Sequence, residues 1–362
     1  MIGEFRTVGD GGGGAMSLSE IERGLSRLRA NDDGTIGARA SVLNLIVVTD
    51  EESAEGVTRV INELSGRYPS RALVMISDPE EERANLEIGI SVFCNVRGGA
   101  GTNVCAEGVT LHVEGPPARH LESLAGPLLL PDLPVFLWYP NGNTPASPKC
   151  DGMAALAGRI VLDTGAAPDP ESSLRAVADL VGHEETPAVG DLQWAALSPW
   201  RSLVRDLFTP PERAGELGRI RRVEVQYAPD ARSRALLFAG WLSSCLGWRP
   251  EAASRTDEGG RELTFAGPSG TVTVLLTPND SDAALRTVRL RCDDGLSFEV
   301  SRHRESTDAR STVLRGDEPV GERTVHLGPS DTGALLGEEL RLVARDEIYE
   351  AALHRAVEIL NL

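Results

Sequence analysis

Apolar positions in the first half of the chain follow two different periods. From residue 42, the runs VLNLIVVT and RALVMIS are apolar at nearly every position, which is typical of strands buried on both faces of a sheet. Between them, residues 51–68 repeat apolar side chains at the spacing i, i+3, i+4 and i+7 of an amphipathic helix. This order of strand, helix and strand predicts a βαβ unit with parallel strands.

Two longer apolar runs follow, LEIGISVFCNV and EGVTLHVEG, joined by the glycine-rich stretch RGGAGTN. They are expected to pair as an antiparallel hairpin, so the predicted sheet is mixed. In GPLLLPDLPVFLWY, Pro131 and Pro134 stop the preceding helical pattern, and the apolar run VFLWY then resumes as a central strand. Trp138 and Tyr139 fall at its carboxyl end, where ligands and partners meet open α/β sheets. A place in the core is the other interpretation of this aromatic pair.

A different pattern begins after residue 183. The stretch GDLQWAALSPWRSLVRDLF predicts a helix with one apolar stripe, which is expected to be buried between two domains. Short alternating strands follow, with hairpin signals such as DDG, and an amphipathic helix ends the chain. This order predicts an antiparallel sheet covered by helices.

These patterns predict an α/β fold with two domains. The first has a mixed, mostly parallel sheet flanked by helices, and the second is an α+β domain with an antiparallel sheet. The expected divisions are a leader or linker over residues 1–16, an α/β domain with an N-terminal helix over 17–183, a connector with a helix over 184–220, and the α+β domain over 221–362. The leader is left outside the fold because its glycine run cannot offset its ordering entropy by burial.

Charge and composition narrow the classes of partner. The formal net charge is −18, so the field of the whole molecule repels nucleic acid. No apolar run reaches the roughly 18 to 20 residues that a membrane-spanning helix needs, and the start shows no signal-peptide pattern. A cytoplasmic protein without nucleic-acid or membrane partners is expected.

The motifs of common catalytic sites are absent from the sequence. No glycine-rich loop opens the first predicted helix, RGGAGTN lacks the lysine of a phosphate loop, and GxSxG, HExxH and SxxK do not occur. We therefore expect no cofactor, no metal and no catalytic residues. The five cysteines show no metal-ligand spacing, and buried thiols are the simplest interpretation. Cys94 and Cys105 are the only pair close in sequence, which makes them redox candidates.

Three stretches carry a family resemblance: EGVTLHVEG, GPLLLPDLPVFLWYPNG and GDLQWAALSPWRSLVRDLF. Together with ASVLNLIVV, RYPSRALVMI and RDEIYEAALHRAVEIL, they resemble the glucose-6-phosphate dehydrogenase assembly protein family, OpcA, over about residues 18 to 362. The family commonly has Cys-Ser and Trp-Trp where this chain has Cys105-Ala106 and Trp138-Tyr139.

The resemblance implies a bacterial, non-catalytic partner that binds glucose-6-phosphate dehydrogenase and favours its active oligomeric form, in support of the oxidative pentose phosphate pathway. Surface aromatic and arginine side chains are the usual anchors of such contacts. The candidate contact residues are Trp138, Tyr139, Trp194, Trp200 and Arg201. Two other functions remain open: a sugar-phosphate-binding enzyme, and a redox-sensing regulator that uses Cys94 and Cys105.

Overall fold

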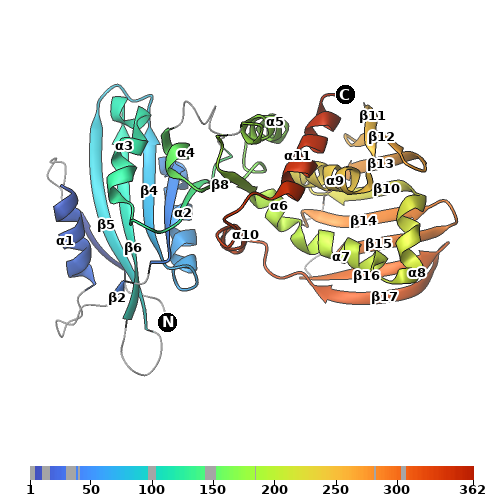
Figure 1. The fold of residues 1–362 in the computed structure, drawn as a ribbon, viewed down its shortest axis with the longest axis horizontal. Helices are drawn as coiled ribbons and strands as arrows, with labels where there is room; N and C mark the ends of the chain where they lie inside the picture. The colour runs from blue at the N-terminus through green and yellow to red at the C-terminus, as the bar shows by residue number, and fades with distance from the viewer. Residues whose placement is uncertain are drawn as a thin grey trace. The chain divides into compact units, whose positions relative to one another are not determined.

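The computed structural model describes residues 5–9, 17–29, 38–39, 41–96, 103–142, 152–183, 185–280, 283–302 and 307–362. Their contacts divide the chain into two units (Figure 1). The first unit contains Met1–Asp163, His183–Gly190 and Thr332–Arg345. The second contains Thr164–Gly182, Asp191–Asp331 and Asp346–Leu362. The chain therefore passes between the units several times rather than once.

The first unit is built on a mixed sheet with the strand order β1-β5-β6-β4-β3-β7-β8-β9, in which β2 also pairs with β6. Strands β6, β4, β3, β7 and β8 run parallel, whereas β5 and β1 are antiparallel to their neighbours. The strands are β1 (Phe5–Gly9), β2 (Ala38–Arg39), β3 (Leu43–Thr49), β4 (Ser70–Asp78), β5 (Asn85–Val96), β6 (Asn103–Glu114), β7 (Val135–Tyr139), β8 (Arg159–Leu162) and β9 (Ala188–Asp191). The predicted parallel βαβ unit and the β5–β6 hairpin are confirmed.

Helices cover both faces of this sheet. Side chains of successive strand residues point to opposite faces. In β4, Arg71 reaches α1, whereas Ala72 borders a small cavity with α2, so these two helices lie on opposite faces. The helical segments of the unit are α1 (Leu18–Leu28), α2 (Glu51–Ser65), η1 (Pro116–Arg119), α3 (Leu121–Ala125), η2 (Gly126–Leu128), α4 (Gly152–Leu156) and α10 (Thr332–Glu339).

The second unit contains a sheet with the order β11-β12-β13-β10-β14-β15-β16-β17. Its neighbours are antiparallel except β10 and β13, which confirms the predicted antiparallel-rich α+β arrangement. The strands are β10 (Ile220–Tyr227), β11 (Arg249–Arg255), β12 (Arg261–Gly267), β13 (Gly270–Pro278), β14 (Leu285–Cys292), β15 (Leu296–Arg302), β16 (Asp308–Arg315) and β17 (Glu318–His326).

Helix α9 is buried on most of its surface because β10 and α11 pack against it. Helix α7 packs against β15 and β16, where the ring centres of Phe208 and Phe298 lie 4.4 Å apart. The helical segments of the second unit are α5 (Pro170–Val181), α6 (Leu192–Ala196), α7 (Ser198–Phe208), α8 (Pro211–Ala214), η3 (Gly215–Arg219), η4 (Pro229–Ala231), α9 (Arg232–Leu246) and α11 (Glu347–Leu360).

The unit boundaries differ from the predicted ones in three places. The predicted connector helix is part of the second unit as α7, because its apolar stripe covers that unit's own sheet. Helix α5, expected to complete the first domain, packs against α9 and α11. Helix α10 joins the first unit, where it packs against α2.

The predicted leader also takes part in the fold. Residues Phe5–Gly9 form β1, which pairs antiparallel with β5 from Phe5↔Phe93 to Gly9↔Gly89. Strand pairing uses only backbone N–H and C=O groups, so β1 needs no apolar pattern of its own to pair with the edge of β5 that faces away from β6. The glycine run of residues 11–14 and the joining stretch of residues 97–102 lie outside the described residues.

The close approach of α9 to α11 makes one glycine indispensable. A Cβ atom added to Gly240 would lie 2.2 Å from the carbonyl oxygen of Ala352, a backbone atom that cannot rotate away. We expect Gly240→Ala to lower the free energy of unfolding by about 1–3 kcal/mol through overpacking. The measurement is urea unfolding of the intact chain.

A matched control is Gly56→Ala in the middle of α2, where an added Cβ atom has nothing within 4 Å. Because alanine favours helices, this variant should be more stable by roughly 0.5–1 kcal/mol. Equal effects of the two substitutions would show that α9 and α11 do not pack this closely in solution.

Candidate functional site

The strand order of the first unit contains a reversal point. Read from β3, the parallel strands follow the doubly wound order, with β4 and β6 on one side and β7 and β8 on the other, and β9 lies next to β8 at that edge. In such sheets, ligands bind at the carboxyl ends of the two strands where the order reverses. Here those strands are β3 and β7, so their ends are the first place to look for a ligand site.

The ends of β3 and β7 carry a polar contact in place of a phosphate loop. Asp50 follows β3 and caps α2, accepting a hydrogen bond from the backbone N–H of Ser53 at 2.9 Å. Its second carboxylate oxygen accepts a hydrogen bond from the side-chain amide of Asn141, just after β7. The first turn of α2 also carries Glu51 and Glu52. Carboxylates at a helix N-terminus disfavour a phosphate group there.

Trp138 and Tyr139, the aromatic pair predicted near this edge, belong to the core. They are 1% and 8% exposed, respectively, because both faces of β7 are covered. Their side chains therefore offer almost no surface to a partner. Their burial agrees with the other interpretation of the sequence, in which the aromatic pair lies in the core.

The other predicted contact residues gather in the second unit. Trp194 is buried, and its indole N–H donates to a carboxylate oxygen of Asp346 at 2.8 Å. The guanidinium of Arg201 lies 3.4 Å from the centre of the Trp194 ring, in cation–π geometry. Trp200 is buried on the apolar stripe of α7. Of this group, Arg201 is only half-buried, whereas both tryptophans are inside the fold.

The cysteines occupy different environments. Cys105 in β6 is buried and disulfide-bonded, and the β5–β6 register places the Cα atom of Cys94 opposite it. The side chain of Cys94 lies outside the described residues, so its role in a redox pair stays a prediction. Cys245 is a free, exposed thiol, whereas Cys292 is free and buried. Burial, with the nearby carboxylates of Glu216, Asp294 and Asp293, raises the pKa of Cys292 to about 12.

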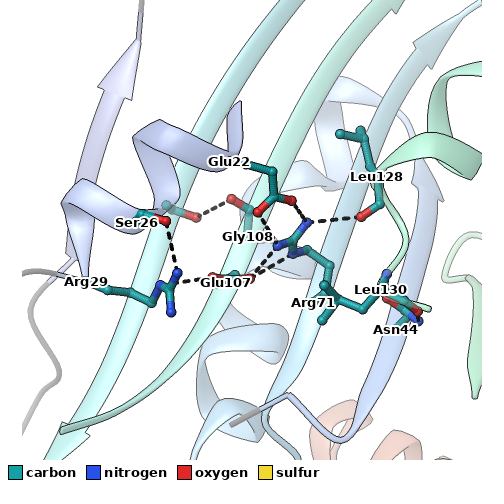
Figure 2. Close-up of polar contacts among 10 residues, drawn as sticks. Glu22, Ser26, Arg29, Asn44, Arg71, Glu107, Gly108, Leu128 and Leu130 are labelled. Atoms are coloured by element: carbon teal, nitrogen blue, oxygen red, sulfur yellow. Dashed lines mark hydrogen bonds and ion pairs between the residues drawn. The ribbon is translucent and has the colours of Figure 1, made fainter. Parts of the chain in front are cut away.

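A group of charged residues with a buried centre lies between α1 and the sheet. We call it the charge cluster, and it consists of Glu22, Arg29, Arg71 and Glu107 (Figure 2). The guanidinium of Arg71 donates to Glu107 at 2.6 and 2.9 Å and to Glu22 at 2.9 Å. Arg29 approaches the other oxygen of Glu107 at 3.1 Å. The Arg71 and Glu107 side chains have no exposed surface.

Electrostatics keep the Arg71 guanidinium ionised despite its burial. Desolvation acts to lower the pKa of Arg71, but hydrogen bonds and charge from Glu22 and Glu107 outweigh it, so the pKa is raised. Arg71 also donates to the carbonyl oxygen of Leu128 at 3.1 Å. One side chain thus joins α1, β6 and the segment that leads into β7.

The proline-rich segment before β7 has a second anchor. Asn44, the second residue of β3, is fully buried and hydrogen-bonds both backbone groups of Leu130 at 2.8 and 3.0 Å. Pro131 and Pro134 supply no backbone N–H, and Asp132 adopts a left-handed conformation with φ 64°. The buried amide therefore substitutes for the regular hydrogen bonds that this segment cannot make.

A second buried ion pair fastens α10 to the same sheet. Arg159, the first residue of β8, donates to Glu339 at 2.6 and 3.1 Å and to the carbonyl oxygen of Ala344 at 2.8 Å. Both side chains are almost completely buried. Gly190 in β9 leaves room for this pair, because a Cβ atom there would collide with the Glu339 carboxylate.

Sequence reasoning missed both buried ion pairs, although the sequence contains a signal for them. A charged or amide side chain inside an otherwise apolar strand has to find a partner, because an unpaired buried charge is costly. Arg71, Asn44 and Arg159 are such residues. Their carboxylate and carbonyl partners come from distant parts of the chain and could not be named from spacing.

Among the described residues, one set of side chains comes close enough to hold a metal ion: Glu216, Cys292 and Asp294, whose ligand atoms lie within 4.8 Å of one another. Arg219 already supplies positive charge here, 3.4 Å from Asp294 and 3.8 Å from Glu216. The thiol also stays protonated at neutral pH, since its pKa is raised to about 12. We assign no metal to this set.

Within the described part of the chain, no helix is long and apolar enough to cross a membrane. Residues 61–179 match the family model of the glucose-6-phosphate dehydrogenase subunit N-terminal domain. Residues 187–353 match the model of the C-terminal domain of the same subunit. The chain belongs to the OpcA family. Both units of this OpcA chain contribute residues to the matched regions.

Three curated relatives are provisionally named OxPP cycle protein OpcA. The protein from Synechocystis sp. is 27% identical over 201 residues, which cover 54% of this chain and 41% of the relative. The protein from Nostoc punctiforme is 29% identical over 196 residues, which cover 54% of this chain and 42% of the relative. The match therefore spans less than half the length of these OpcA proteins.

Solved structures of oxidoreductases show only a distant likeness. A dehydrogenase (MviM) from Clostridium difficile superposes with a TM-score of 0.43 at 8% identity, covering 88% of this chain and 97% of that structure. An oxidoreductase from Sinorhizobium meliloti superposes with a TM-score of 0.41 at 11% identity, covering 87% and 86% of the two chains.

Proposed function

We propose that this chain is a non-catalytic partner that binds glucose-6-phosphate dehydrogenase and promotes its active oligomeric state. The observation that carries the proposal is that two successive regions match domains described as parts of a glucose-6-phosphate dehydrogenase subunit. The names of the relatives refer to the OxPP cycle, which agrees with a partner that is a glucose-6-phosphate dehydrogenase. The dehydrogenase is therefore the partner to test first.

The geometry of the first unit supports a role without catalysis. At the ends of β3 and β7, the side chains of Asp50 and Asn141 form a hydrogen bond with each other. Acidic residues occupy the start of α2. Among the described residues, the Arg71–Glu107 and Arg159–Glu339 pairs are buried and neutralise each other, so neither pair presents a charge to a substrate. The same acidic edge disfavours the alternative of a sugar-phosphate-binding enzyme.

Activation of this kind requires only modest differences in binding energy. A partner shifts an equilibrium between two states of an enzyme when it binds one state more tightly than the other. A tenfold shift corresponds to about 1.4 kcal/mol of differential affinity. A small number of well-placed contacts is therefore enough, and the partner needs no reacting group of its own.

The test is a titration of the purified chain into the dehydrogenase from the same organism, following NADPH formation and particle mass by light scattering. We expect a complex at micromolar concentration, a larger enzyme oligomer and a higher rate, with no turnover by the chain alone. Glucose 6-phosphate should tighten the complex if it favours the same enzyme state, because coupling is reciprocal. The absence of a complex, or a complex with unchanged kinetics and oligomer size, would contradict the proposal.

Redox control of this function is a second candidate, supported by the disulfide of Cys105 and the position of Cys94 opposite it in the sheet. Repeating the titration after treatment with dithiothreitol tests it. Reduction should free two thiols, which mass spectrometry of alkylated peptides assigns, and should change the affinity for the dehydrogenase. An affinity indifferent to reduction would remove redox control while leaving the partner role intact.

A further inference from the structure

The second unit contains an open groove of about 600 Å³ between α7 and α9, which extends to β14 and the start of α11. Its lining is mostly apolar and includes Phe208, Trp241, Leu246 and Leu290. Ile348 lies at its edge and is 54% exposed, so apolar surface continues beyond the cavity. The volume lies within the range of cavities that bind ligands or large side chains.

The charged residues that line this groove are both basic. Arg201 and Arg205 lie one helical turn apart on α7, and none of the described residues that line the groove carries a carboxylate. Arg205 is well exposed and forms a surface pair with Asp206, which lies outside the lining. Basic charge along one side of an apolar groove stands out in a chain with a net charge of −18. It favours an occupant that combines apolar and acidic groups.

We propose that this groove binds an amphipathic segment of the dehydrogenase; this proposal rests on the function proposed above. Apolar side chains of the segment enter between Phe208, Trp241 and Leu246, and its Asp or Glu residues face Arg205. Grooves between helices commonly accept amphipathic helices in this way. Tryptophan and arginine are also the side chains most enriched among residues that dominate binding energy.

Two groove variants test this assignment with little risk to the fold. Arg205→Glu reverses a charge on an exposed side chain. Ile348→Asp replaces an exposed apolar residue in the first turn of α11, where a carboxylate is favoured by the helix dipole. Each should weaken the complex by roughly tenfold or more, measured as its dissociation constant. Because Arg205 lies in the last turn of α7, its reversal should lower the melting temperature by no more than a few degrees. Higher salt should weaken the wild-type complex more than the Arg205→Glu complex.

Matched controls lie outside the groove. Arg59 on α2 resembles Arg205, since their side chains are 67% and 70% exposed and each pairs with a neighbouring carboxylate. Val320 on β17 resembles Ile348, with exposed fractions of 58% and 54%. Arg59→Glu and Val320→Asp should leave the dissociation constant within about twofold of the wild-type value, because neither residue lines the groove.

Cys245 provides a chemical probe of the same surface. It lines the groove and is exposed, although partial burial raises the pKa of its thiol. Iodoacetamide should alkylate it in the free chain at mildly alkaline pH, and complex formation should slow that reaction by roughly tenfold or more. Cys292, which is buried and has a pKa raised to about 12, serves as the slow reference.

The outcomes separate this inference from the function on which it rests. If the wild-type chain forms no complex with the dehydrogenase, both fall. If the complex forms but the groove variants bind like the wild type, or Cys245 is not protected, the groove assignment falls and the partner role stands. A wild-type dimer that Ile348→Asp dissociates would assign the groove to self-association instead. A small amphiphile retained there in native mass spectrometry would likewise overturn the assignment.

Discussion

Replacing Arg71 with methionine is expected to lower the free energy of unfolding by about 3–5 kcal/mol, because it removes one partner from a fully buried ion pair. Glu107 would keep Arg29 at 3.1 Å but lose both hydrogen bonds from the Arg71 guanidinium. Leu128 would lose the donor to its carbonyl oxygen. Urea unfolding followed by circular dichroism measures the effect.

The control for this prediction is Arg59→Met, which removes an exposed arginine from a surface pair and should cost no more than about 0.5 kcal/mol. A double variant, Arg71→Met with Glu107→Leu, removes both buried charges. It should lose less stability than the sum of the two single changes, since neither partner is then left buried alone. If Arg71→Met were no more destabilising than Arg59→Met, the charge cluster would not contribute to stability in solution.

The charge cluster is part of a wider feature of the first sheet. Asn44, Arg71 and Arg159 each stand at the first or second position of a parallel strand, and each side chain is buried. Each one bonds to a segment outside the sheet: Asn44 to the proline-rich segment, Arg71 to α1 and Arg159 to α10. The amino-terminal edge of the sheet is thus fastened by buried polar side chains, whereas its carboxyl edge carries exposed acidic residues.

The sequence pattern predicted the local elements well. Strands β3, β4 and β7 are apolar on both faces, and α2 shows the helical spacing, so each was found from its own residues. Assignment to a unit was harder, because it depends on contacts between distant residues. Helix α5 belongs to the second unit, where Arg175 donates to the carbonyl oxygen of Leu360 at 2.8 Å. No local pattern encodes that contact.

The candidate contact residues show a different limit of sequence reasoning. Residue type suggested that Trp138, Tyr139, Trp194 and Trp200 could act as surface anchors, but the direction of a side chain depends on the packing around it. All four are buried. The groove was not predicted, because its lining combines residues from α7, α9, β14 and α11 that are up to about 150 positions apart in the chain. Trp241 and Arg205 carried no distinguishing motif.

Replacing Trp200 with alanine is expected to lower the free energy of unfolding by about 3–5 kcal/mol, the usual range for removing a large buried aromatic side chain. Trp200 is 4% exposed and belongs to the stripe of α7 that includes Leu203 and Leu207. For a unit of this size, the melting temperature should fall by roughly 6 to 20 °C. Scanning calorimetry of the intact chain measures this change.

Trp241→Ala is the matched control, because it makes the same chemical change at a half-buried position that lines the groove. It should cost less stability than Trp200→Ala, since less of its surface is removed from water. Its effect on binding should be the larger of the two, because Trp241 contributes surface to the groove and Trp200 does not. A shift of less than about 2 °C for Trp200→Ala would show that no packed core surrounds Trp200 and would return it to the candidate contact residues. If Trp200→Ala weakened binding to the dehydrogenase and Trp241→Ala did not, the contact surface would lie away from the groove.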